Sequence, residues 1–199
     1  MYIGTSLFMS FLVFIGSVDP YDLTYTFKQT VFELGLWRPF TAILYLSRVG
    51  LLLPFHIGFA YITFKYAVNK MYGEQDQPGL LWLFILSSLG LAIFSTFTGL
   101  YFYGNSFIMI LLMMWTIQHP TDRFYIVNYA LPCAYLPIIY AGTMVTLGSS
   151  FKNYMAGFLL GLLLGIIKNR PFIEKNGDLF PTPKFILALF DSQNPYVLA

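Results

Sequence analysis

The chain has 199 residues, of which 57% are hydrophobic and 20% aromatic, while only 10% carry a charged side chain. Soluble domains have about a quarter of their residues charged, so this composition excludes an ordinary soluble domain and indicates a membrane protein. The net charge of +2 contains no block of like charge, which argues against nucleic acid as a partner. We expect one domain covering residues 1–199, whose single cysteine, Cys133, packs in an apolar run.

A long interval without charged residues occupies the middle of the chain. No Asp, Glu, Lys or Arg lies between Asp76 and Asp122, which is too long for one membrane crossing of about 20 residues. A turn is predicted at Tyr103-Gly104-Asn105, where glycine and asparagine tolerate turn dihedrals, which leaves helices over about 79–101 and 105–117. The second helix reaches only about 20 Å, less than the hydrocarbon core of about 30 Å. We therefore expect protein to surround it, or the membrane to thin around it.

Applied to the whole chain, this reasoning predicts an all-α membrane protein with six spans, at about 2–18, 50–68, 79–101, 105–117, 127–147 and 152–167. A tail over 168–199 begins with turn-forming residues and then carries a short apolar segment, 185–190. We expect that segment to lie on the membrane or against the helices.

The predicted spans also indicate an orientation. Six spans place both termini on one side, where seven basic residues stand against four on the other side. The positive-inside rule then predicts that both termini face the cytosol or an equivalent compartment. No basic region precedes the first span, so a removable signal peptide is not expected.

Trp37 and Arg38 lie near the end of a long, amphipathic first loop, which runs from Asp19 to about Thr41, just before the chain returns to the membrane. Tryptophan favours the headgroup level and arginine can reach phosphate, so one interpretation is an interfacial anchor. The other is a loop that inserts into one leaflet and disturbs it. The apolar positions of the loop are compatible with both: Leu23, Phe27, Val31, Phe32, Leu34 and Leu36.

Ser106 begins the short fourth span and raises the question of an intramembrane serine nucleophile. Such a serine needs a general base within hydrogen-bond reach. The two histidines, His56 early in the second span and His119 in the fourth loop, both lie off the last span. A hydroxyl near the start of a helix is more often a cap, so we expect no catalytic residue and no enzymatic activity.

Three glycines, Gly157, Gly161 and Gly165, follow one another at a spacing of four in the last span. This spacing puts them on one face of a helix, where missing side chains let another helix approach closely. We interpret them as packing residues.

The sequence lacks the residue patterns of several other functional classes. It has no His, Cys or carboxylate cluster for a metal or haem, and no phosphate-binding glycine loop. We therefore expect no cofactor and no metal. Charged residues are also missing from the middle of the spans, which disfavours a pump or an ion-coupled transporter.

Together, the six spans, the long first loop, the short fourth span and the glycine-stepped sixth span resemble the Derlin family, whose members are pseudoproteases of the rhomboid-like superfamily. Local segments strengthen the likeness. They are Asp19-Pro20, Leu36 to Ala42 (Leu-Trp-Arg-Pro-Phe-Thr-Ala), Ala134 to Pro137, Gly157-x-x-x-Gly161, and Phe180 to Phe185.

The resemblance implies a six-helix rhomboid-like fold and a non-catalytic part in the retrotranslocation of misfolded proteins, in the endoplasmic-reticulum membrane. Its implied partners are the lipid bilayer and other membrane subunits, such as a ubiquitin-ligase complex, with a homo-oligomer as a further arrangement. Derlins commonly place a histidine after the second glycine of the sixth-span motif, whereas Leu162 stands here. Ser106 would thus lack its base. The family's usual amphipathic stretch before the first span and its glycine-arginine box are not in the sequence, which puts direct recruitment of the unfoldase ATPase in doubt.

A second hypothesis belongs to a different class. The Derlin-like fold could serve as a structural subunit of a large membrane assembly, for example in the mitochondrial inner membrane. Short termini would suit this role because they leave out the parts that contact cytosolic machinery. The fold alone does not decide between the two functions.

Overall fold

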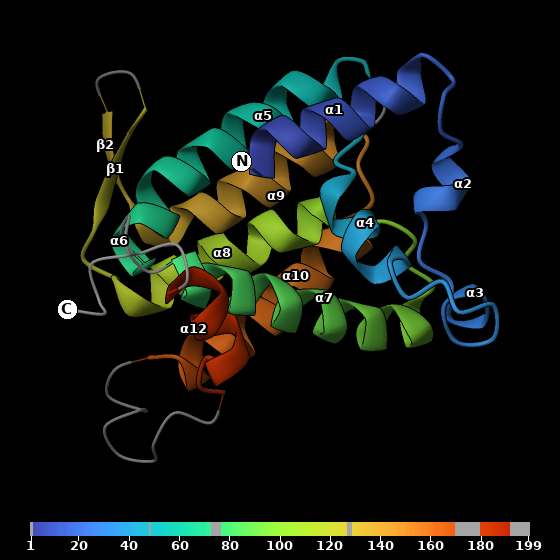
Figure 1. Ribbon diagram of the computed structural model, residues 1–199. Helices are drawn as coiled ribbons and strands as arrows, with labels where there is room; N and C mark the ends of the chain where they lie inside the picture. The colour runs from blue at the N-terminus through green and yellow to red at the C-terminus, as the bar shows by residue number, and fades with distance from the viewer. Residues whose placement is uncertain (1, 48, 73–76, 127–128, 170–179, 192–199) are drawn as a thin grey trace.

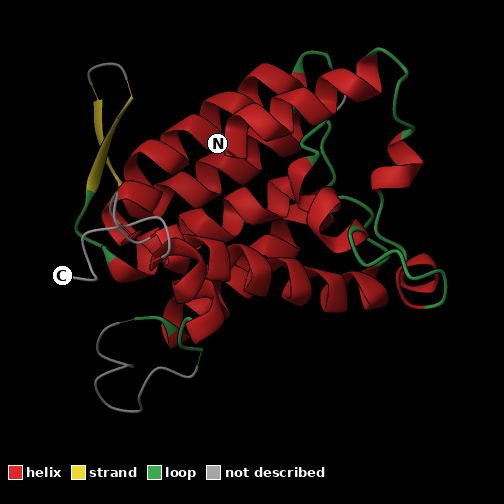
Figure 2. Cartoon of the chain, in the orientation of Figure 1, coloured by secondary structure: helices red, strands yellow, loops and turns green. Residues whose placement is uncertain are grey.

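The computed structural model describes residues 2–47, 49–72, 77–126, 129–169 and 180–191, which form a helical bundle with a two-stranded hairpin at one end (Figures 1 and 2). In chain order its elements are α1 (Tyr2–Phe14), α2 (Pro20–Leu23), α3 (Phe27–Val31), α4 (Arg38–Leu44), α5 (Leu52–Ile62), the π-helical η1 (Thr63–Val68), α6 (Asn69–Tyr72), α7 (Gln77–Thr98), α8 (Gly104–Gln118), β1 (Arg123–Ile126), β2 (Tyr129–Pro132), the 3₁₀ turn η2 (Cys133–Tyr135), α9 (Leu136–Thr146), α10 (Phe151–Ile167) and α12 (Lys184–Asp191).

The connections between the long helices gather at two opposite ends of the bundle (Figure 1). At one end the first loop meets the α7–α8 connection. At the other, Lys70 Nζ lies 2.7 Å from Asp122 Oδ1, and the Gln118 side-chain amide donates to the Lys168 carbonyl at 3.4 Å. The second loop, the fourth loop and the start of the tail are therefore neighbours, as alternating helix directions predict. The orientation in the membrane stays a prediction.

Helix α8 is enclosed by the rest of the molecule. Every residue from Gly104 to Trp115 is buried, which leaves no lipid-facing stripe over these residues. With 15 residues, the helix is about 22 Å long at 1.5 Å per residue. Protein surrounds the short helix, as its length predicts.

Helix α7 has the length and composition of a membrane-spanning helix, with 22 apolar-rich residues. Leu83, Ser87 and Leu91 bury one stripe at helical spacing, while Ile93 and Phe97 on other faces are exposed. In the described part of the chain it is the one helix that meets both criteria, and α1, α8, α9 and α10 are apolar but shorter. The helical bundle agrees with the predicted fold class, but the number of spans stays a prediction.

The predicted second span is a continuous helical segment that runs from α5 through η1 to α6, and so extends beyond the expected end at 68. The wide turn of η1 begins at Thr63, whose hydroxyl donates to the Phe59 carbonyl at 2.7 Å. The Nζ atom of Lys65 lies over the rings of Tyr61 and Tyr66, at 5.6 and 5.4 Å from the two ring centroids. Its ammonium is thereby accommodated near the end of an apolar helix.

The fifth span was expected to begin at about 127, and this prediction was wrong. β1 and β2 form an antiparallel pair in which Phe124 lies opposite Leu131, and the helix starts only after Tyr135. Proline explains the difference, because Pro132 disfavours helical backbone at the residue before it. The aromatic and β-branched residues of β1 also favour a strand.

The apolar segment of the tail forms α12, which packs on α7. Ile186 is completely buried, whereas Phe185 and Leu189 are exposed. The Trp82 indole also donates to the Phe180 carbonyl at 3.1 Å, which ties the start of this segment to α7. The segment thus lies against the helices on one side. The turn-forming residues Pro171, Asn176 and Gly177 lie outside the described residues.

Candidate functional site

The first loop is built from the short helices α2, α3 and α4, and the starts of α2 and α4 are encoded locally. The Asp19 carboxylate accepts a hydrogen bond from the Tyr21 backbone N–H at 2.9 Å and caps α2, and Pro20 occupies its first position. Pro39 stands at the second residue of α4. The Asp19-Pro20 and Arg38-Pro39 pairs therefore act as helix-start signals.

Arg38 holds the loop from within. One guanidinium nitrogen, Nη1, donates to the Tyr21 carbonyl at 3.0 Å and to the Thr24 carbonyl at 3.2 Å, at the C-terminal end of α2. Gly35 leaves room for the arginine stem, since a Cβ there would lie 3.0 Å from Arg38 Cδ. A cation at the last carbonyls of a helix is favourable. Arg38 is thus committed to bracing the loop, a contact that the sequence did not specify.

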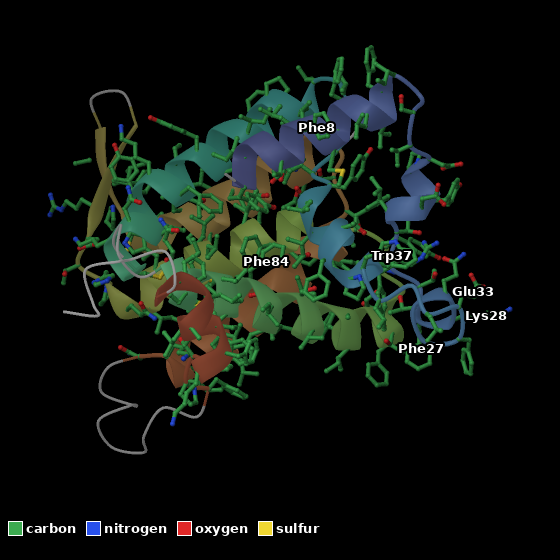
Figure 3. The ribbon with its side chains drawn as sticks, viewed as in Figure 1. Phe8, Phe27, Lys28, Glu33, Trp37 and Phe84 are labelled. Carbon is green, nitrogen blue, oxygen red and sulfur yellow. The ribbon has the colours of Figure 1, made fainter. Side chains whose placement is uncertain are left out.

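Trp37 has the opposite environment. Its side chain is 59% exposed, and four other apolar side chains of the loop are exposed as well: Phe27, Phe32, Leu34 and Leu36. With Trp37 we call them the first-loop apolar surface, of which Figure 3 labels Trp37 and Phe27. Leu34 has φ of 55°, which is rare for a residue with a side chain and belongs to the turn that presents this surface. Among the other apolar positions of the loop, Leu23 is buried.

The first loop is joined to the α7–α8 connection by backbone hydrogen bonds. The Tyr25 N–H donates to the Tyr101 carbonyl at 3.0 Å, and the Tyr103 N–H donates to the Ala42 carbonyl at 2.9 Å. The first bond joins the stretch between α2 and α3 to this connection, and the second joins α4 to the residue before α8, so the loop is fixed against the start of α8. No pattern in the sequence predicts them, because a backbone hydrogen bond between distant segments depends on no particular side chain.

Ser106 is buried at the start of α8, and its hydroxyl donates to the Asn153 carbonyl of α10 at 2.7 Å. Among the described residues, neither His56 nor His119 is hydrogen-bonded to it. Leu162, at the position where a histidine was expected by resemblance, is 38% exposed. The hydroxyl thus links two helices, and its hydrogen-bond acceptor is a carbonyl, which cannot act as the general base that a serine nucleophile needs.

The three glycines of α10 lie on the face that packs against α8. A Cβ at Gly157 would overlap the Ser106 carbonyl oxygen, and one at Gly161 would lie 2.8 Å from the Cα of Ile110. Backbone atoms cannot move away as a side chain can. At Gly165 the nearest atom is instead the end of the Ile117 side chain, at 2.6 Å, which can rotate away. Gly157 and Gly161 therefore face the tighter restriction.

Sequence reasoning missed a pair of buried polar residues. His56 Nε2 lies 3.4 Å from the hydroxyl of Tyr154, which joins α5 to α10. The Tyr154 ring also packs edge-on against Tyr140 of α9, with 5.3 Å between centroids. Each of the three residues lies in a different helix, so no local sequence pattern predicts these contacts.

A second cluster that the sequence did not predict joins elements at the opposite end of the bundle. The Asp122 carboxylate accepts hydrogen bonds from Lys70 at 2.7 Å and from the Trp115 indole at 3.0 Å. Partial burial tends to raise the pKa of Asp122, but the hydrogen bonds from Lys70 and Trp115 outweigh it and lower the pKa below the usual value. Within the described residues, no group of three or more His, Cys, Asp or Glu could hold a metal ion.

Comparison with known proteins agrees with this architecture. The model of the Der1-like family matches residues 1–184. Derlin-2.1 of Zea mays is 28% identical over 192 residues, covering 90% of this chain and 77% of that protein, and Derlin-2 of Oryza sativa subsp. japonica is 27% identical with the same coverage. Derlin-1 of Oryza sativa subsp. japonica is 28% identical over 144 residues, covering 70% and 57%. This chain is a membrane protein of the Der1-like family.

Proposed function

We propose that this protein is a non-catalytic component of the retrotranslocation of misfolded proteins at the endoplasmic-reticulum membrane. The observation that carries the proposal is the first-loop apolar surface, which is exposed at the same end of the bundle as the start of the short helix α8 (Figure 3). A loop that enters one leaflet beside a short helical core would thin and disturb the bilayer locally.

Such a disturbance would assist the passage of a polypeptide. A backbone polar group without a hydrogen-bond partner costs several kcal/mol in the hydrocarbon core, so a translocating chain is strongly opposed by an intact bilayer. A thinner, wetter region lowers this cost without any chemical step. Arg38 would keep the loop in position, and Trp37 would be its contact with lipid or client.

The non-enzymatic part of the proposal is supported by Ser106. Its hydroxyl is occupied by the Asn153 carbonyl, which can accept a hydrogen bond but cannot take a proton. A serine nucleophile requires a neighbouring base, and the described residues provide none in contact with it. A pseudoprotease of the rhomboid-like superfamily would show this arrangement.

The proposed partners follow from the role. We infer that the protein works with the surrounding lipid and with membrane subunits of a ubiquitin-ligase complex, with self-association as a further arrangement. The alternative role, as a structural subunit of a large assembly in the mitochondrial inner membrane, is not favoured by the names of the relatives, and we do not propose it.

The experiment compares Trp37→Ala with Phe8→Ala in cells that depend on this protein. Phe8 is a matched control because it is 60% exposed on α1, close to the 59% of Trp37. We expect Trp37→Ala to lengthen the half-life of a misfolded membrane substrate while expression and partner co-purification stay unchanged, and Phe8→Ala to leave the half-life unchanged. The proposal would be overturned if the substrate had the same half-life with Trp37→Ala as with Phe8→Ala. It would also be overturned if Trp37→Ala dismantled a stable assembly without changing the half-life.

A further inference from the structure

A surface pocket of about 530 Å³ lies between the first loop and the α7–α8 connection. Its lining combines two opposite charges, from Lys28 and Glu33, with the aromatic rings of Tyr21 and Tyr101 and the polar side chains of Thr26 and Gln29. None of the residues of the first-loop apolar surface lines this pocket. A concave site with a few converging polar groups is typical of small-ligand binding.

The walls of the pocket are fixed by hydrogen bonds. Arg38 holds the carbonyls of Tyr21 and Thr24, and the Tyr25 N–H holds Tyr101 against the loop. On the α3 side, the Thr26 hydroxyl donates to the Gln29 side-chain oxygen. Because the walls are held before a ligand arrives, less ordering would be needed on binding.

Lys28 and Glu33 are not neutralised by one another. In the described part of the chain the single ion pair is that of Lys70 with Asp122, at the far end of the bundle. Both side chains are exposed, in the region of the loop that Figure 3 labels. The pocket therefore presents a separate cation and anion, which suits a ligand that carries both charges.

The surroundings of the pocket suit a position at the membrane surface. Phe27 and Phe32 flank Lys28 and Glu33 in sequence and belong to the first-loop apolar surface. Apolar side chains that enter the acyl region would leave the neighbouring charged groups at headgroup level.

We propose that this pocket binds the headgroup of a zwitterionic phospholipid. The Lys28 ammonium pairs with the phosphate, and Glu33 pairs with the choline or ethanolamine cation. The rings of Tyr21 and Tyr101 add the aromatic faces that favour such cations. An anionic lipid would place its negative headgroup beside Glu33, so charge complementarity selects the zwitterion. This inference goes beyond the proposed function, because the lipid site would exist whether or not the protein serves degradation.

The test uses the full-length protein in mild detergent, titrated with dihexanoyl phosphatidylcholine or dihexanoyl phosphatidylglycerol and followed by native mass spectrometry. We expect Lys28→Gln to weaken binding of both lipids. Glu33→Gln should weaken phosphatidylcholine binding and strengthen phosphatidylglycerol binding, and the double variant should lose about tenfold in phosphatidylcholine affinity, or about 1.4 kcal/mol. Lys152→Gln and Asp22→Asn are the controls, because both residues are exposed and neither lines the pocket.

Three results would overturn the proposal. They are wild-type binding of phosphatidylglycerol as tight as that of phosphatidylcholine, equal loss in the control variants, and capture of polypeptide in place of lipid. Lys28→Arg keeps the cation and should keep the binding, which separates a charge effect from misfolding. The thiol of the buried Cys133 should become reactive at the same temperature in every variant.

Discussion

The α8–α10 pair and the first loop differ in how they are held together. Between α8 and α10, glycines bring backbone against backbone, and α8 shows no exposed face between Gly104 and Trp115. In the first loop, hydrogen bonds from Arg38 and Tyr25 hold the backbone while large apolar side chains point outward. One region buries its apolar surface within the fold, whereas the other leaves its apolar side chains exposed. Variants in the two regions should therefore fail in different ways.

The largest effect is expected from Gly161→Leu. A leucine there must displace the α8 backbone, and overpacking typically costs about 1–3 kcal/mol or more. For a chain of this size the melting temperature falls by about 2–4 °C per kcal/mol. The thiol of Cys133 is buried, so its labelling by a thiol-reactive dye on heating reports unfolding.

The matched control is Gly142→Leu in α9, where a Cβ has no neighbour within 4 Å. It should leave the melting temperature nearly unchanged. Equal melting of both variants and the wild type would show that the close approach of α10 to α8 is not needed for stability.

Arg38→Ala should loosen the first loop with little effect on the bundle. It removes two hydrogen bonds to backbone carbonyls, each worth about 1 kcal/mol, in a region that contributes little to the core. Hydrogen–deuterium exchange should rise over residues 20–26 and stay unchanged in α8. Arg38→Lys should give an intermediate result, since a single ammonium cannot copy the guanidinium geometry. Exchange that rises throughout the bundle would contradict this separation.

Ser106→Ala should cost about 1 kcal/mol of stability, the usual contribution of one hydrogen bond, and leave function intact. Under the proposed non-enzymatic function, the variant breaks only the link to Asn153. Degradation assays should match the wild type, and a serine-directed probe should not label Ser106 in the native membrane. Covalent labelling of Ser106 would contradict the non-enzymatic account.

The smallest effect is a dependence on pH at the end of the bundle opposite the first loop. The pKa of Asp122 is lowered in the folded protein, so its stabilising contribution is present above the unfolded pKa of about 3.9 and is lost as pH falls through the folded pKa. Melting temperatures of the wild type should therefore fall more between pH 5 and pH 3 than those of Asp122→Asn. Lys70 is half-exposed, which keeps the difference small. An equal fall in both proteins would assign the acid sensitivity to other carboxyls.

The sequence predicted the regular core better than it predicted the site. Helices near 79–101 and 105–117 follow from the length of the stretch without charged residues, and a helix near 152–167 agrees with the spacing of its glycines. The helices α7, α8 and α10 lie close to these limits. The hairpin is not predicted because an apolar run does not distinguish a strand from a helix. Pro132 argues against helix at this point of the chain. The bracing role of Arg38 and the contact of His56 with Tyr154 depend on partners far away in the chain, which no local pattern encodes.

The claim that the first loop enters the bilayer can be tested most directly with Trp37 itself. The protein is reconstituted in phosphatidylcholine brominated at the upper acyl chain, and the Trp37 signal is taken as the fluorescence difference between the wild type and Trp37→Phe. We predict that brominated lipid quenches this signal strongly, while aqueous iodide quenches it weakly. Trp115 is 2% exposed and should resist both agents. Strong quenching of the Trp37 signal by iodide, with none by brominated lipid, would place the loop in water and contradict the account.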